Sequence, residues 1–135
     1  MTYRHVARAL ACLASVILVT PARAGAWSPP EIAEESLFQA IHLIDLGQTL
    51  DIHHHDNIQE MGISQGGCAW AIGHYPSEPR IYAYMGAEAV MHFLITDLLV
   101  HYGRPWMVHT FEAATISVNA LVIDDNARLG LTVKF

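Results

Sequence analysis

Two mostly apolar segments, residues 81–100 and 105–123, constrain the fold of this chain more than any other feature of its sequence. A helix of about 20 apolar residues is long enough to cross the hydrocarbon core of a bilayer, which is roughly 30 Å thick. Gly103 and Pro105 end the first segment, and the short turn between the segments predicts an antiparallel helical hairpin. We therefore expect an α-helical membrane protein, and the alternative is a soluble, secreted helical bundle.

The first apolar segment would insert into lipid only marginally without partner helices. Its eight Leu, Ile, Val or Phe residues each contribute roughly −0.3 to −0.6 kcal/mol to insertion. Glu88 and His92 lie near its centre, where a charged side chain costs about 2.5 to 3.5 kcal/mol. The two contributions nearly cancel, so this segment is expected to need other helices beside it.

A third helix is predicted at residues 29–50. Ser28 can act as its N-cap, Pro29 suits the first helical position, and Glu31 completes a capping box. Residues 51–80 are expected to form one long loop, and the tail 129–135 alternates apolar and polar residues as an extended segment does. The predicted fold class is thus all-α, a small bundle of three helices of which two or three span the membrane.

Residues 1–24 are typical of a cleaved signal peptide. Arg4 and Arg8 give a basic start, an apolar run of eleven residues follows at 9–19, and small residues precede a cleavage site after Ala24. This run is too short to span a bilayer, although an uncleaved anchor helix is the alternative. Export is therefore expected, with residues 25–135 forming the helical membrane domain.

The charges argue against one class of partner and indicate a location. Residues 25–135 keep four basic residues against 13 acidic ones, a formal charge of −9, so no basic surface for nucleic acid is expected. If all three helices span, Arg104 alone among the four falls outside, which fits the positive-inside rule. The predicted location is the bacterial inner membrane, with the lipid bilayer as partner, and the periplasm is the alternative. Three helical segments leave too few residues for the roughly eight strands of an outer-membrane barrel.

Polar residues recur at helical spacing within each predicted helix. Residues three, four or seven apart share one face of a helix, so each set forms a polar stripe. In lipid such groups must turn inward and find one another, which predicts a buried polar seam. Each stripe pairs a histidine with a carboxylate one turn away: His42 with Asp45, Glu88 with His92, and His109 with Glu112. The stripes also include Glu35, Gln39, Thr49, Tyr84, Thr96 and Asn119.

Two interpretations of this seam remain open. It can be a hydrogen-bonded seam that fixes the helix register or handles protons. It can also be a metal site, because Glu-x-x-His pairs on facing helices build di-metal carboxylate centres, and His109-x-x-Glu112 has the same spacing in reverse order. A divalent transition metal is the cofactor that this second interpretation predicts.

A second metal candidate lies in the long loop. The loop contains a run of four potential ligands: His53, His54, His55 and Asp56. Short histidine-rich tracts can bind Zn, Cu or Ni. Adjacent residues rarely all reach one ion, so Asp51, His74 or another chain would have to supply further ligands. The alternative is a solvated loop that holds no ion.

No catalytic motif is evident in the sequence. It contains no Gly-rich phosphate loop, no nucleophile elbow and no paired-cysteine zinc site. The first hypothesis is therefore a small non-enzymatic integral membrane protein that acts through its polar seam or through association with itself or other membrane proteins. The alternatives are a metal- or proton-binding helical bundle with catalytic capacity, and a soluble periplasmic helical domain.

Three short motifs resemble those of a group of small, uncharacterised helical membrane proteins from proteobacteria and their phages. The group has Asp-x-x-Gln-Thr on the first helix, a Gly-His-Pro-Ser-like loop, an Asn-x-x-x-Gly ending and a histidine on the second helix. The corresponding residues here are Asp45–Thr49, Gly73–Ser77, Asn126–Gly130 and His92. Tyr75 interrupts the second motif, and residues 69–72 replace an Asn-Pro-led segment of the group. The resemblance spans nearly all of residues 25–135 and implies a helical membrane protein without an assigned activity.

Overall fold

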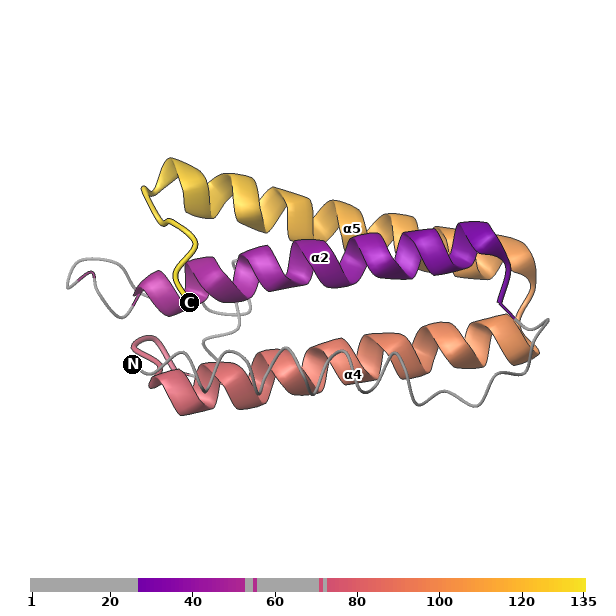
Figure 1. Ribbon diagram of the computed structural model, residues 1–135, viewed down its shortest axis with the longest axis horizontal. Coiled ribbons are helices and arrows are strands. Elements are labelled where there is room, and N and C mark those ends of the chain that lie inside the picture. The colour runs from indigo at the N-terminus through magenta and orange to yellow at the C-terminus, as the bar shows by residue number, and fades with distance from the viewer. Residues whose placement is uncertain (1–26, 53–54, 56–70, 72) are drawn as a thin grey trace.

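The computed structural model describes residues 27–52, 55, 71 and 73–135, and within them the fold is an all-α bundle. Its three helices are α2 (Pro29–Ile52), α4 (Glu78–Tyr102) and α5 (Pro105–Arg128). They run side by side along most of their length, with α4 antiparallel to both α2 and α5 (Figure 1). The predicted three-helix fold is confirmed. The predicted signal peptide, most of the long loop and the candidate ligands His53, His54 and Asp56 lie outside the described residues.

Local hydrogen bonds explain where α2 and α4 begin. The backbone N–H of Ser28 donates to the Glu31 carboxylate at 2.6 Å, which is one half of the predicted capping box. The Ser77 carbonyl accepts the backbone N–H groups of Arg80 and Ile81, so α4 begins three residues before its predicted start at 81. The helices also end two residues later than predicted, at Ile52 and Tyr102.

The predicted end of α5 near residue 123 is wrong, because the helix continues to Arg128. Asp124 and Asn126, just past the predicted end, are poor helix formers. In the structure, however, Asp124 forms an ion pair with Arg128 one turn later, at 2.6 Å, and Asn126 donates a hydrogen bond to Asp45 of α2 at 3.2 Å. The helix stops before Gly130, whose φ of 86° lies in the left-handed region that glycine adopts readily.

The interior of the bundle combines a small apolar core near one end with a row of buried polar side chains on α2. Leu46 and Leu50 of α2 pack with Ile81 and Met85 of α4 to form a small hydrophobic core. Further toward the α4–α5 turn, α2 buries a row of polar side chains: Glu31, Glu35, Gln39 and His42. Its outward face carries the exposed apolar residues Ile32, Leu37 and Ile44. This helix is therefore polar inside and apolar outside along much of its length.

The C-terminal tail folds back onto the last turns of α2. The backbone N–H and the hydroxyl of Thr132 both donate to the buried carboxylate of Asp51, at 2.8 and 2.9 Å. The Lys134 backbone N–H donates to the Gly47 carbonyl at 3.0 Å, and Leu131 is buried. Residues 131–135 form no strand, so the alternating pattern corresponds to an extended segment that α2 holds in place.

Gly47→Ala is expected to lower the midpoint of thermal unfolding and to release the tail. A Cβ atom at position 47 would lie 2.5 Å from Val133 Cγ1, so the tail would have to move away from α2. Overpacking of this kind costs about 1 to 3 kcal/mol. Thermal unfolding of the purified protein and the rate of C-terminal trimming by a carboxypeptidase measure the two effects.

Gly86→Ala is the matched control for this substitution. A Cβ atom on this α4 glycine meets no other atom within 4 Å, and alanine favours a helix over glycine by up to about 1 kcal/mol. The control is expected to keep or raise the midpoint and to leave trimming unchanged. Equal trimming of both variants and the wild type would contradict the packing of the tail against Gly47.

Candidate metal centre

His92 lies at the centre of the buried polar groups. It is on α4, and both of its ring nitrogens face oxygen atoms of neighbouring helices. Nδ1 lies 3.1 Å from a carboxylate oxygen of Glu35 on α2. Nε2 lies 2.9 Å from the hydroxyl of Thr115 and 3.9 Å from Oε2 of Glu112, both on α5. One imidazole therefore connects all three helices.

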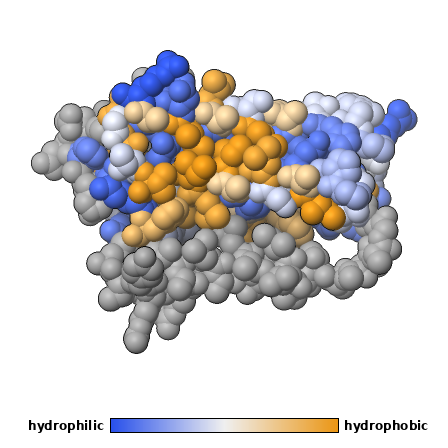
Figure 2. Space-filling model, turned by 45° about the horizontal axis from the view of Figure 1, so that its top comes forward, coloured by the Kyte–Doolittle hydropathy of each residue, from blue (hydrophilic) through white to orange (hydrophobic). Residues whose placement is uncertain are grey.

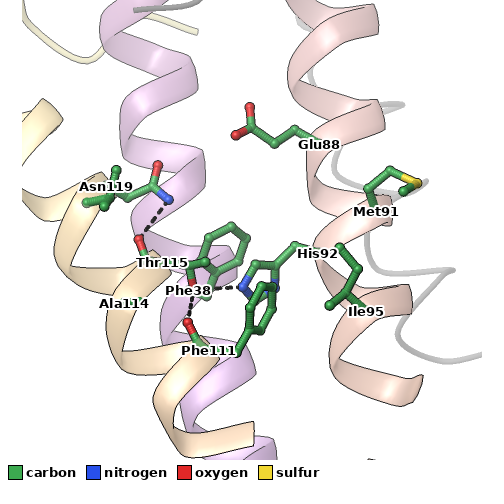
Figure 3. A pocket seen from close by; sticks show the side chains of 10 residues that line it. Phe38, Glu88, Met91, His92, Ile95, Phe111, Ala114, Thr115 and Asn119 are labelled. Atoms are coloured by element: carbon green, nitrogen blue, oxygen red, sulfur yellow. Dashed lines mark hydrogen bonds between the residues drawn. The ribbon is translucent and has the colours of Figure 1, made fainter. Parts of the chain in front are cut away.

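Two aromatic rings fix the orientation of this imidazole. Phe38 of α2 stacks on one side of the His92 ring, with the ring centroids 3.3 Å apart and the planes 6° from parallel. Phe111 of α5 packs against the same ring at 4.7 Å (Figure 3). Since the ring is held between neighbours, its nitrogens keep their direction toward Glu35 and Glu112.

Glu112 is the most deeply buried carboxylate of the described residues. Its Oε1 accepts a hydrogen bond from the Thr96 hydroxyl at 2.8 Å. Its Oε2 has no hydrogen-bond partner among the described residues, although the side chain has no exposed surface. A buried carboxylate oxygen without a partner is destabilising unless a proton, a water molecule or a cation satisfies it.

Glu35, His92 and Glu112 together form a candidate metal site, which we call the Glu–His–Glu triad. Each comes from a different helix, all three are buried, and one potential ligand atom of each lies within 4.8 Å of the others. Even with a protonated imidazole, the two carboxylates would leave one negative charge in the interior. A divalent cation bound to a neutral imidazole would neutralise both carboxylates, and this nitrogen and oxygen donor set suits Zn, Mn or Fe.

The structure brings together two of the six residues singled out from the sequence for the seam, His92 and Glu112. Glu35 was recognised as part of the polar stripe on α2, but His42 and Asp45 were selected there instead. His42 Nε2 lies 2.9 Å from the Met85 carbonyl, and Asp45 accepts the hydrogen bond from Asn126. Neither belongs to the triad.

The other two selected residues face away from the triad. His109 is exposed and forms an ion pair with Glu34 at 2.8 Å, so its pairing with Glu112 along α5 does not bring it inside. Glu88 is also exposed and lines a pocket between α4 and α5. Helical spacing alone did not distinguish these outward residues from the buried ones.

Of the histidine run in the loop, the structure describes only His55. Its Nε2 lies 3.5 Å from the Asp51 carboxylate, which is also the acceptor for the C-terminal tail. Asp51 was suggested as an additional ligand for this run. In the structure Asp51 binds the tail through Thr132, and Lys134 Nζ approaches it at 3.8 Å.

Comparisons of this chain with protein-family models, with curated proteins and with solved structures find no match. The similarity in motifs to small helical membrane proteins therefore remains a prediction. The site among the described residues combines two buried carboxylates and one oriented imidazole from three helices, and one of its carboxylate oxygens lacks a hydrogen-bond partner there.

Proposed function

We propose that this chain is a small integral membrane protein that binds one divalent transition metal ion through the Glu–His–Glu triad. The observation that carries the proposal is the buried Oε2 of Glu112, which lacks a hydrogen-bond partner among the described residues and lies 3.9 Å from His92 Nε2. That separation is too long for a hydrogen bond. A metal ion bound to both groups would satisfy the oxygen and offset the charge of Glu35.

The exposure of α4 and α5 supports the membrane part of the proposal. Both helices are long and apolar enough to cross a bilayer, yet only 22% and 11% of their most apolar windows are buried. The core helix of a soluble protein would be mostly buried. Here large apolar side chains face outward instead, among them Met91, Leu94, Leu98, Val118 and Leu121. A lipid environment would solvate these side chains.

The orientation of α2 supports a third span. By composition α2 is too polar to pass as a membrane helix, but its polar side chains face α4 and α5 while Ile32, Leu37 and Ile44 face outward. Figure 2 shows apolar side chains gathered over the middle of one face of the bundle and hydrophilic ones toward its ends. We propose that all three helices cross the inner membrane together after export.

A metal ion in the triad would act on the bundle as a whole. Since each helix contributes one ligand, the ion links the three helices and stabilises their assembled state. The Thr115 hydroxyl lies 2.9 Å from His92 Nε2, but it donates to the backbone carbonyls of Phe111 and Glu112, so its proton is not directed at the imidazole that would have to activate it. We therefore assign a non-enzymatic role in which metal binding fixes the bundle, and with it the surface presented to other membrane proteins or to a second copy.

A proton-handling seam is the second candidate function. The 3.1 Å contact between Glu35 and His92, continued by Thr115 at 2.9 Å, is a chain of hydrogen-bonding groups through the interior. Chains of carboxylates and histidines within a membrane also occur in proton relays. A purified wild-type chain that folds cooperatively without any bound metal would favour this candidate.

Metal analysis of the protein purified in mild detergent tests the metal part. We expect about one equivalent of a divalent transition metal per chain. Removal of the ion with a chelator should lower the unfolding midpoint and return of the ion should restore it, because a ligand that binds only the folded state stabilises it. Absence of stoichiometric metal after growth in any supplemented medium would contradict the assignment.

A carbonate wash of isolated membranes tests the membrane part separately. An integral membrane protein stays in the pellet at high pH, whereas a peripheral or periplasmic protein is released into the wash. We expect the chain in the pellet. Release of the chain into the wash would exclude membrane insertion. It would not affect the metal assignment, because a soluble bundle could hold the same triad.

A further inference from the structure

A pocket of about 340 Å³ lies between α4 and α5, beside His92 (Figure 3). Most of its wall is apolar: Phe111 and Phe38 contribute aromatic rings, and Met91, Ile95 and Val118 contribute aliphatic side chains. Cavities of this size hold small organic molecules. Met91, Ile95 and Val118 are also exposed, so the pocket opens on the outer face of two helices that we propose to be in lipid. Its occupant would therefore enter from the membrane.

Among the described residues that line this pocket, Glu88 is the one carboxylate. It lies near the middle of α4, and its carboxylate is directed away from that helix, toward the space between α4 and α5 (Figure 3). Neither a hydrogen bond nor an ion pair to Glu88 is found among the described residues. A carboxylate near the middle of a membrane helix is costly, and such residues usually pair or mark a binding site.

We infer that this pocket binds a membrane-soluble amine, with its ammonium group on Glu88 and its apolar body between Met91, Ile95 and Val118. The ammonium group supplies the positive charge and the donors that Glu88 lacks. The apolar wall supplies burial for an alkyl or aromatic body. Asn119 lies across the pocket on α5 (Figure 3); its amide nitrogen donates to the Thr115 carbonyl at 3.2 Å, and its amide oxygen can accept a second hydrogen bond from the ammonium group.

This inference does not depend on the metal. Glu88 is not part of the Glu–His–Glu triad, and no pocket-lining residue except His92 belongs to it. Glu88→Gln should therefore leave the metal content and the unfolding midpoint of the purified protein unchanged. Loss of amine binding together with unchanged metal content would locate the effect in the pocket.

Photolabelling with a diazirine-bearing dodecylamine tests the inference. The full chain is reconstituted in phosphatidylcholine nanodiscs, because the quaternary ammonium of this headgroup has no N–H to donate to Glu88. Labelled peptides are identified by mass spectrometry. We expect labels concentrated on Met91, Ile95 and Val118, and roughly tenfold less labelling there with the neutral diazirine-bearing dodecane of equal length. Equal labelling by the two probes, or labels spread evenly over all outward apolar residues, would overturn the inference.

Three variants make the result specific. Glu88→Gln should reduce labelling by the amine to the level of the neutral probe, and Val118→Trp should reduce labelling by both probes because the indole fills the pocket. Glu34→Gln, at a glutamate outside the pocket, should change neither. If labelling survives Glu88→Gln at its wild-type level, or if a second copy is crosslinked through this face in place of the probe, the amine site is wrong.

Competition identifies the source of the amine. The primary amine can belong to a lipid headgroup, as in phosphatidylethanolamine. It can also belong to a free lipophilic amine, which has no phosphate. Suppression of labelling by added phosphatidylethanolamine would assign the pocket to the lipid. Suppression by unlabelled dodecylamine alone would assign it to a free amine. If neither amine competes with the probe, labelling is non-specific and the inference fails.

Discussion

The His92→Ala protein is expected to purify with less than roughly 0.1 equivalent of metal, where the wild type carries about one. His92 is the only nitrogen ligand of the Glu–His–Glu triad, and it lies between the two carboxylates. Without it, only the two carboxylates remain as ligands, and a proton shared between Glu35 and Glu112 would compete with the ion. Elemental analysis of the purified protein and titration with Co²⁺, followed by its visible spectrum, measure the loss.

His109→Ala is the matched control, since it also removes a histidine next to a glutamate. His109 pairs with Glu34 on the surface and is not a member of the triad, so the metal content should stay at the wild-type level. Glu112→Gln guards against misfolding, because it keeps the shape of the side chain and the Thr96 contact while removing the charge. Metal retained at wild-type stoichiometry in both His92→Ala and Glu112→Gln would exclude the triad as the binding site.

The sequence was sufficient for the helices because apolar length and capping are local properties. Ser28, Pro29 and Glu31 predicted the start of α2, and Gly103 with Pro105 predicted the break between α4 and α5. The end of α5 was misjudged because Asp124 and Asn126 are poor helix formers in isolation. Their contacts with Arg128 and with Asp45 extend the helix, and the second of these joins residues far apart in the sequence.

The ligands of the Glu–His–Glu triad were harder to predict. They depend on the axial position of each residue along the bundle as well as on the helix face that it occupies. Residues were paired within single helices, yet the triad takes one residue from each helix. In an antiparallel hairpin, residues at similar distances from the turn meet. His92 lies eleven residues before Gly103 and Glu112 nine residues after it, so this rule would have paired them and separated Glu88 from His109.

No comparable rule was available for Glu35. The axial position of α2 relative to α4 depends on how the long connection between them folds. Neither helical spacing nor capping determines this position. Glu35, Gln39, His42 and Asp45 were therefore equivalent as candidates on one stripe. Two contacts help to set this axial position in the structure: the hydrogen bond from the tail to Asp51 and the packing of Phe38 on His92.

Val90→Arg is expected to abolish stable membrane insertion of most of the protein. Val90 lies near the middle of α4 and its side chain is 39% exposed, on a face that we propose to be in lipid. An arginine at the centre of a membrane helix costs about 2.5 to 3.5 kcal/mol. Because α4 inserts only marginally by itself, this cost shifts the balance from mostly inserted to mostly excluded. The carbonate-resistant fraction, after synthesis in the presence of inner-membrane vesicles, measures the shift.

Tyr102→Arg provides the control, because it introduces the same charge on the same helix but at its end. Tyr102 is 86% exposed, and an arginine there can reach the headgroup region, so the carbonate-resistant fraction should match the wild type. The two variants together also distinguish a lipid environment around α4 from an aqueous one. On a water-exposed helix, either arginine would change stability by no more than about 0.5 kcal/mol, and the variants would behave alike. If the Val90→Arg protein partitions and unfolds like the Tyr102→Arg protein, α4 faces water. The outward apolar residues would then need a protein partner to cover them.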